Sequence, residues 1–194
     1  IVIFFSDNGG VEWYNFSDNG VLRGIKGDFF EGGIRVPFTM QWPKKIKPGI
    51  TYDKPIIALD VFATVASAAS AEKYIKNNID GVDLLPYLTG DKFGLPHEYL
   101  YWQNPDKDID VVRDERYKYL RIKNDEYIFD LKNDISEETN IINSSKPIYD
   151  RLKSQFKEWE KGMIDPVFMD LGMGKEYNKL NPDRWYNDSN PEKQ

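Results

Sequence analysis

Short runs of β-branched and aromatic residues between residues 99 and 131 constrain the fold more than any other feature of the sequence. Two of the links between them, Asp114–Arg116 and Lys123–Asp125, are of hairpin length. Links this short join antiparallel neighbours, because a parallel crossover needs a dozen or more residues. The sequence therefore predicts a small antiparallel sheet with four strands, at 99–102, 111–113, 117–122 and 127–131.

A helix with an apolar stripe is predicted after the last of these runs. Ser145, with Pro147 close behind, is a typical helix start, and Gly162 can end the helix. Four apolar side chains recur at intervals of four, four and three residues: Ile148, Leu152, Phe156 and Trp159. We expect this stripe to pack on the inner face of the sheet.

The part of the chain before residue 96 has a different pattern. Ile1–Phe5 is typical of a strand buried on both faces, and the glycine-rich stretch up to Gly33 predicts a long functional loop. Ile34–Trp42 and Ile56–Leu59 are expected to be strands. Asp60 is interpreted as the N-cap of a helix. The face of that helix expected to point into the core consists of Val61, Phe62, Val65, Ala66 and Ala69.

These patterns predict an α/β fold with three parts. We expect the last part of a large mixed sheet over residues 1–95, a small antiparallel sheet with a helix over 96–162, and a polar tail over 163–194. Natural chains seldom begin inside a core strand, so we expect these residues to be the C-terminal portion of a longer protein.

The composition excludes several classes of function. The absence of cysteine excludes disulfides, cysteine-ligated metals and thiol catalysis within these residues. With 26 basic and 32 acidic residues the formal net charge is −6, and no basic stripe is present, so nucleic acid is not an expected partner. No apolar run approaches the roughly 18 to 20 residues that a membrane-spanning helix needs.

The tetrapeptide Ser-Asp-Asn-Gly occurs twice. In the first copy, Asp7 and Asn8 directly follow the expected strand, at the end where open α/β sheets bind ligands. Carboxylate and amide oxygens are suitable donors for calcium or magnesium. An ordinary turn is the alternative. The second copy, Ser17–Gly20, follows no expected strand, so a turn is the favoured interpretation there.

Four charged or titratable residues are further candidates. Lys26 lies between two glycines and could present its ammonium group to an oxyanion, although a solvated loop charge has the same pattern. Glu31 and Arg35 are more typical of a structural ion pair that braces the turn between them. His97, the only histidine, is more typical of a structural or surface role than of a substrate contact.

Several segments, taken in order, resemble the C-terminal part of the formylglycine-dependent sulfatases, the arylsulfatase-like branch of the alkaline phosphatase superfamily. The resemblance extends from Ile1 to about Trp159. The segments that carry it are Ser6–Gly10, Leu22–Gly27, Glu31–Phe38, Leu59–Thr64, Asp80–Pro86, Val112–Tyr119 and Phe129–Glu137.

The resemblance implies roles for individual residues. Asp7 and Asn8 match two ligands of the family's divalent cation, usually calcium, and Lys26 matches the catalytic lysine that contacts the substrate's sulfate. The resemblance assigns no role to His97, which is kept as a second candidate substrate contact. The family's nucleophile, a formylglycine made from a Cys or Ser, is expected upstream of these residues. The 194 residues alone are therefore expected to be inactive and to bind calcium weakly or not at all.

The resemblance also implies a sulfated carbohydrate or an aryl sulfate as substrate, and a periplasmic, secreted or lysosomal location. Two other functions remain open. One is phosphoester hydrolysis or phosphoryl transfer within the same superfamily. The other is a non-catalytic carbohydrate-binding module, for which the aromatic residues of the predicted sheet could form a sugar platform.

Overall fold

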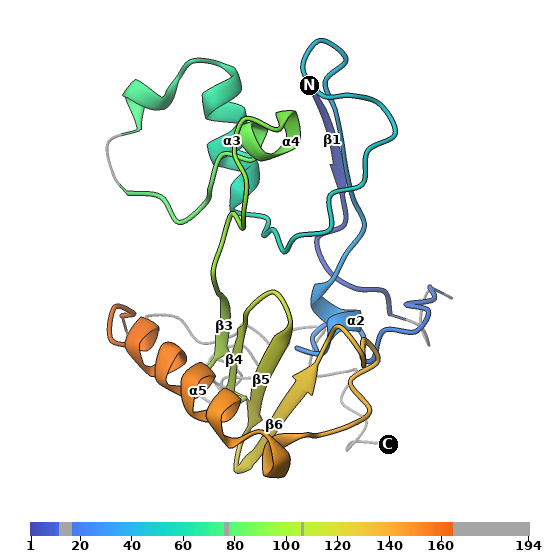
Figure 1. Cartoon of the computed structure of the whole chain (residues 1–194), viewed down its shortest axis with the longest axis vertical. Coiled ribbons are helices and arrows are strands. Elements are labelled where there is room, and N and C mark those ends of the chain that lie inside the picture. Colours follow the sequence, from blue (N-terminus) through green and yellow to red (C-terminus); the bar gives the residue numbers. More distant parts are fainter. Residues whose placement is uncertain (12–16, 76–77, 106, 165–194) are drawn as a thin grey trace, which may run out of the picture.

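The computed structural model describes residues 1–11, 17–75, 78–105 and 107–164. It has two parts along its long axis (Figure 1). One part holds a two-stranded ladder and short helices, and the other holds a four-stranded sheet with the longest helix. Within the described residues, no helix combines the length and the apolar character needed to cross a membrane. The tail expected from residue 163 falls, from residue 165 onward, outside the described residues.

The predicted antiparallel sheet is confirmed. Its strands are β3 (Leu100–Asn104), β4 (Ile109–Arg113), β5 (Tyr117–Ile122) and β6 (Asp125–Asp130), and each pairs antiparallel with the next in the order β3-β4-β5-β6. Val111 of β4 pairs with Leu120 of β5, and Leu120 pairs in turn with Tyr127 of β6. Hairpin-length links decide this topology because they leave the chain no room for a crossover.

One face of the sheet packs against α5 (Lys146–Glu160), as the helical stripe predicts. Ser145 is the N-cap, and Leu152 and Phe156 are buried in this core. At the rim of the same face, Trp159 stacks on Tyr101 of β3, with 4.9 Å between ring centroids. The sheet residues buried on this side are Val112, Tyr119 and Ile128.

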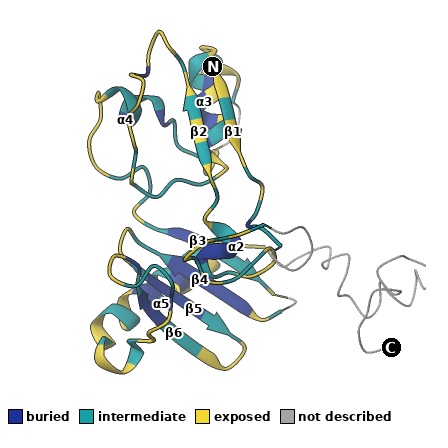
Figure 2. Cartoon of the chain, turned by 90° about the vertical axis from the view of Figure 1, so that its right-hand side faces the viewer, coloured by how far each residue is buried: buried dark blue, intermediate teal, exposed yellow. Residues whose placement is uncertain are grey.

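The other face of the sheet packs against the loop before α2 (Glu31–Ile34), a contact between segments far apart in the sequence. Phe29 and Phe30 pack against the sheet here, and the ring of Phe30 lies 6.2 Å from that of Phe129. The buried residues on this side are Ile109, Val111, Leu120 and Phe129 of the sheet and Leu131, which directly follows β6. Both faces are covered, which explains why successive residues such as Val111 and Val112 are both buried (Figure 2).

The first strand differs from the sequence-based expectation. The expected strand is present as β1 (Val2–Phe5), which pairs antiparallel with β2 (Phe38–Gln41). However, Val2 is 64% exposed and Phe4 71%, and Ile3 is the one residue of β1 that is partly buried (Figure 2). The expectation of a strand buried on both faces is therefore wrong for the described residues.

The two other predicted strands of this region are also corrected. Residues 34–42 contain a strand only over β2, because Ile34 still belongs to α2 and Pro37 lacks an N–H for pairing. Residues 56–59 form no strand: the N–H of Ile57 donates to the side chain of Asp60, 2.9 Å away, rather than to a neighbouring strand.

The predicted helix exists as α3 (Asp60–Ala68), but of its expected core face only Ala66 is buried. Phe62 is 60% exposed and Val65 44%, whereas Ala63, Thr64 and Ala66 are buried. The hydroxyl of Thr64 accepts from the N–H of Leu84, and Asp60 accepts from that of Val82, so this face of α3 packs against residues 82–84. Asp60 is the first helical residue and Leu59 the cap position. The segments η1 (Glu72–Tyr74), α4 (Leu85–Thr89) and η2 (Ile142–Ser144) complete the fold.

Candidate functional site

The segment after β1 lies directly against the backbone of α2. The N–H of Gly9 donates to the carbonyl of Gly33 at 2.9 Å. A Cβ on Gly9 would lie 1.7 Å from the carbonyl oxygen of Gly32, so no side chain fits there. These glycines are needed for the close approach of two backbones, and this approach determines where the residues before Gly9 are held.

Asp7 and Asn8 present oxygen atoms that the fold leaves unused. Asp7 is exposed, and its carboxylate makes no hydrogen bond or ion pair with any described residue. The Asn8 side chain donates from Nδ2 to the carbonyl of Gly9 at 2.9 Å, and its Oδ1 accepts no hydrogen bond within the described part of the chain. A free carboxylate next to a free amide oxygen fits a hard divalent cation.

Two side chains are not a complete calcium site. Calcium takes about six to eight oxygen ligands. Among the described residues, no group of three or more acidic, histidine or cysteine side chains lies close enough together to hold a metal ion. Further ligands would have to come from other parts of the protein, from backbone carbonyls or from water.

Lys26 is held next to this segment by its backbone. Its N–H donates to the carbonyl of Gly10 at 3.2 Å. The glycines at 24 and 27 adopt φ angles of +86° and +91°, which let the chain turn on either side of the lysine. The Lys26 side chain is exposed and has no carboxylate partner among the described residues. The structure therefore brings the Lys26 loop and the Asp7–Asn8 segment together.

Hydrogen bonds from the side chain of Asn19 stabilise the contact between these two loops. Its Oδ1 accepts from the N–H of Gly10 at 2.9 Å, and its Nδ2 donates to the carbonyls of Gly10 at 3.2 Å and of Gly24 at 3.1 Å. The sequence predicts only a turn here. The turn is present, since Asp18 accepts from the N–H of Gly20 at 2.7 Å, but the sequence does not predict that Asn19 joins the loops. The repeated tetrapeptide is the only signal for it.

A cluster of charged side chains lies beneath these loops, and we call it the Lys118 cluster: Glu31, Arg113, Lys118 and Glu137. Lys118 Nζ lies 3.2 Å from Glu31 Oε1 and 2.8 Å from Glu137 Oε1. The second contact is a charge pair without hydrogen-bond geometry. Arg113 Nη1 donates to Glu31 Oε2 at 3.0 Å, and the N–H of Glu31 donates to Glu137 Oε2 at 2.6 Å.

The two carboxylates of the cluster have opposite pKa shifts. Burial raises the pKa of Glu31, but the charges of Lys118 and Arg113 outweigh it and hold that pKa below its ordinary value. Burial raises the pKa of Glu137 above its ordinary value, and the charge of Lys118 offsets this only in part. The expected pair of Glu31 with Arg35 exists, at 3.7 Å, but Arg35 is 54% exposed and is not the main partner.

An open cavity of about 320 Å³ lies on the small-sheet side and is not lined by Asp7, Asn8 or Lys26. Its wall includes Tyr99, Tyr117, Arg116 and Arg151. Both arginines are already paired, Arg116 with Asp130 at 2.6 Å and Arg151 with Asp114 at 2.6 Å. The cavity therefore offers aromatic surface but no free positive charge for an anion.

Comparison with known proteins identifies the family of this chain. The family model described as "N-sulphoglucosamine sulphohydrolase, C-terminal" matches residues 26–162, well over half of the chain. The chain belongs to the sulfatase family. The resemblance inferred from the sequence motifs is thereby confirmed.

Several named sulfatases are similar to this sulfatase-family chain. Steryl-sulfatase of Mus musculus is 47% identical over 83 residues, covering 43% of this chain and 13% of the relative. The "Uncharacterized sulfatase YdeN" of Escherichia coli (strain K12) is 36% identical over 132 residues, covering 66% and 23%. Arylsulfatase A of Bos taurus is 36% identical over 124 residues, covering 60% and 24%. The chain spans between 13% and 24% of the length of these relatives.

Solved structures confirm the fold. The crystal structure of Ps i-CgsB in complex with k-i-k-neocarrahexaose has a TM-score of 0.75 and 25% identity, covering 95% of this chain and 42% of that one. The phosphonate monoester hydrolase of Agrobacterium radiobacter has a TM-score of 0.58 and 24% identity, covering 81% and 34%. The chain has the α/β, alkaline phosphatase-like architecture of sulfatases, with its small antiparallel sheet and the helix α5.

His97 of the sulfatase chain contacts Asp60, the first residue of α3. His97 Nε2 lies 2.7 Å from Asp60 Oδ1, and the two side chains are 12% and 0% exposed. Asp60 also accepts from the N–H groups of Ile57 and Val82. No described contact joins His97 to Lys26 or Asp7, and its contacts are those of a residue that holds α3 to the neighbouring segments. A substrate contact by His97 stays a prediction.

Replacement of Asp60 by alanine is expected to lower the free energy of unfolding by about 3 kcal/mol or more, because three donors in or near the core lose their acceptor. The midpoint of urea unfolding measures the effect. The exposed Asp53 is the matched control, since its side chain is 81% exposed and its pair with Lys54 is long, at 3.7 Å. Equal midpoints for the two variants would contradict the structural role of Asp60.

Proposed function

We propose that these residues are the C-terminal part of a sulfatase that hydrolyses sulfate esters. One observation carries the proposal: an exposed lysine without a carboxylate partner among the described residues, Lys26, is held by its backbone against the segment that presents the free oxygens of Asp7 and Asn8. The family membership of the chain supports the same reaction.

Hydrolysis of a sulfate ester is accelerated by positive charge next to the reacting sulfate group. As the S–O bond breaks, negative charge builds up on the oxygens of the sulfate group and of the leaving alcohol, and fixed positive charge stabilises it. We propose that the ammonium group of Lys26 contacts the sulfate and is the catalytic cation of this chain. Asp7 and Asn8 would hold a divalent cation, and we propose Ca²⁺. When bound, this cation would add positive charge next to the sulfate group.

The nucleophile is not among these residues, since the chain contains no Cys and no Ser-x-Pro-x-Arg sequence from which a formylglycine could be made. We therefore expect no turnover by the 194 residues alone, and weak calcium binding. The division into an α/β part over 1–95 and a sheet-and-helix part over 96–162 is retained as a proposal, although Phe29 and Phe30 share a core with the sheet. A location outside the cytosol is likewise a proposal.

The proposed substrate is a sulfated carbohydrate or an aryl sulfate. Relatives named steryl-sulfatase and arylsulfatase A support the aryl type, and the structure of Ps i-CgsB with an oligosaccharide supports the carbohydrate type. Phosphoester chemistry is the second candidate, because the phosphonate monoester hydrolase of Agrobacterium radiobacter has a similar fold. A fold likeness alone does not decide between them.

A lysine substitution tests the proposal in the full-length protein that contains these residues. Lys26→Ala is expected to lower kcat/KM for an aryl sulfate by about 100-fold or more, the usual effect of losing one group that stabilises an oxyanion. Lys44→Ala, at an exposed loop lysine, is the control and should match the wild type. Rates are measured with paired aryl sulfate and aryl phosphate esters.

Each outcome of this assay has a meaning. Faster hydrolysis of the phosphate ester would favour the second candidate. Equal activity of Lys26→Ala and Lys44→Ala would contradict the assignment of Lys26. No hydrolysis of either ester by the wild type, together with binding of sulfated glycans, would favour a carbohydrate-binding module.

A further inference from the structure

Three fully buried charged side chains from distant parts of the chain meet in the Lys118 cluster. Glu31, Lys118 and Glu137 each have 0% exposure. Lys118 lies on β5, Glu137 follows β6, and Glu31 opens α2, which belongs to the loop region. The cluster therefore joins the loops of the proposed site to the sheet, in addition to the apolar contact of Phe29 and Phe30.

A short path of hydrogen bonds joins the cluster to the loops. Next to Glu31 in the chain, Gly32 donates to the carbonyl of Arg23 at 2.6 Å, and Gly33 accepts from Gly9 at 2.9 Å. Arg23 in turn donates from Nη1 to the carbonyl of Glu137 at 2.8 Å. Asn8 precedes Gly9, and Lys26 follows Arg23 by three residues. Both loops are thus tied to the pair formed by Glu31 and Glu137.

Stability alone does not explain why such a cluster occupies this place. Burying charges costs solvation free energy that their attraction seldom exceeds, and apolar residues of similar volume usually stabilise a core equally well. Glu137 also has a φ angle of +54°, which a glutamate rarely adopts. In exchange, the cluster provides directional contacts that fix the position of the Glu31 backbone, which apolar packing does not provide.

We infer that Lys118 is a positioning residue of the proposed site. By pairing with both Glu31 and Glu137, it holds the turn at Gly32 and Gly33, and through that turn it sets how the Asp7–Asn8 segment lies relative to Lys26. The inference rests on the proposed function for its effect on catalysis. The expected effect of Lys118 on hydrogen exchange in the loops does not depend on that function.

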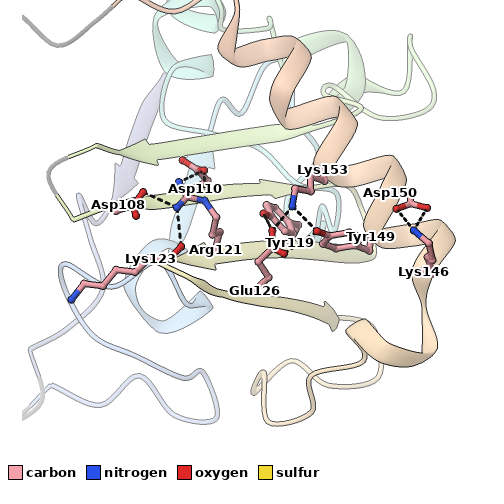
Figure 3. A network of polar contacts seen from close by, with 10 residues as sticks. All are labelled: Asp108, Asp110, Tyr119, Arg121, Lys123, Glu126, Lys146, Tyr149, Asp150 and Lys153. Carbon is pink, nitrogen blue, oxygen red and sulfur yellow. Dashed lines mark hydrogen bonds and ion pairs between the residues drawn. The ribbon is translucent and has the colours of Figure 1, made fainter.

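A partly buried ion pair on the opposite face of the same sheet provides the matched control. There, Lys153 of α5 lies 2.7 Å from Glu126 of β6 (Figure 3). The hydroxyls of Tyr119 and Tyr149 donate to the same carboxylate at 2.6 and 2.8 Å. This pair joins the helix to the sheet, and all of these contacts lie outside residues 6–37. Its loss should affect stability but not the loops.

The experiment compares Lys118→Met with Lys153→Met in the full-length protein. Lys118→Met leaves Glu137 without a cation, whereas Glu31 keeps its pairs with Arg113 and Arg35, so the neutral variant Lys118→Met/Glu137→Gln is made as well. Hydrogen exchange is followed at the amides of Gly9, Lys26 and Gly32, whose N–H groups make the loop contacts. Steady-state kinetics with an aryl sulfate give kcat and KM separately.

We expect exchange at these three amides to become at least about tenfold faster in the neutral variant, and kcat to fall at least about tenfold with a smaller change in KM. Lys153→Met should lower the unfolding temperature and leave both readouts unchanged. If the wild type does not hydrolyse sulfate esters, the proposed function fails and the exchange result still tests the inference. Unchanged exchange in a folded neutral variant would overturn it, and so would a neutral variant that cannot fold, because the cluster would then serve stability alone.

Discussion

Asp7→Ala in the full-length protein is expected to lower kcat/KM for an aryl sulfate by at least about 100-fold. The Asp7 carboxylate is exposed and unpaired within the described residues, so its loss removes a ligand charge and little else. The activity of Asp7→Ala should recover in part as the calcium concentration is raised, because a site with one carboxylate fewer binds the cation more weakly. Activity is therefore measured over a calcium titration that begins in chelator.

The repeated tetrapeptide supplies a matched control for this experiment. Asp18 stands in the same Ser-Asp-Asn-Gly sequence, but its carboxylate accepts from the N–H of Gly20 at 2.7 Å and serves the turn. Asp18→Ala should keep the calcium dependence of the wild type. If Asp7→Ala and Asp18→Ala gave the same titration curve, Asp7 would not be a metal ligand. The first tetrapeptide would then be an ordinary turn.

Gly9→Ala is expected to have the largest effect on the structure of the site. The new Cβ would lie 1.7 Å from the carbonyl oxygen of Gly32 and 2.9 Å from the Cα of Gly33, and both obstacles are backbone atoms that cannot rotate away. The two backbones must separate, so the hydrogen bond from Gly9 to Gly33 is lost. We expect a loss of roughly 2 to 4 kcal/mol in the free energy of unfolding. Activity should also fall sharply, because Asn8 precedes the displaced residue.

Gly162→Ala is the control for this substitution. A Cβ at Gly162 would lie 3.4 Å from its nearest neighbour, the carbonyl oxygen of Trp159, which is ordinary contact. Urea unfolding of the two variants measures the difference in stability. A midpoint for Gly9→Ala within error of that of Gly162→Ala would show that the loops can separate without cost, and the close packing of the site would then have no functional meaning.

Local features predicted the small sheet and its helix correctly. The observed bounds of β5, Tyr117–Ile122, are those of the predicted strand, and Leu152 and Phe156 of the stripe are buried in the core as expected. Hairpin links and helical spacing act between residues close in the chain, so they can be recognised in the sequence alone. The order of motifs was sufficient to recognise the sulfatase family.

Burial near the first strand could not be predicted in the same way. An apolar run indicates which residues would favour a core, but it does not supply the layer that covers them, and β1 is largely exposed within the described residues. The buried face of α3 was wrong for a related reason. Asp60 and Thr64 accept from the backbone N–H groups of Val82 and Leu84, so the face of α3 that carries them packs against this segment, and Phe62 and Val65 lie on the exposed side.

The amino-acid order was enough to predict the strands of the small sheet, the stripe of α5, the family and the identity of the candidate residues Asp7, Asn8 and Lys26. What holds those three residues in place became visible only in the folded chain. Lys118 is 87 residues from Glu31 in the sequence, and Glu137 is 106 residues from Glu31. The three side chains are nevertheless in contact and fully buried. Periodicity and turn chemistry relate near neighbours, whereas a pairing over such distances leaves no local pattern and arises only when the loops fold onto the sheet.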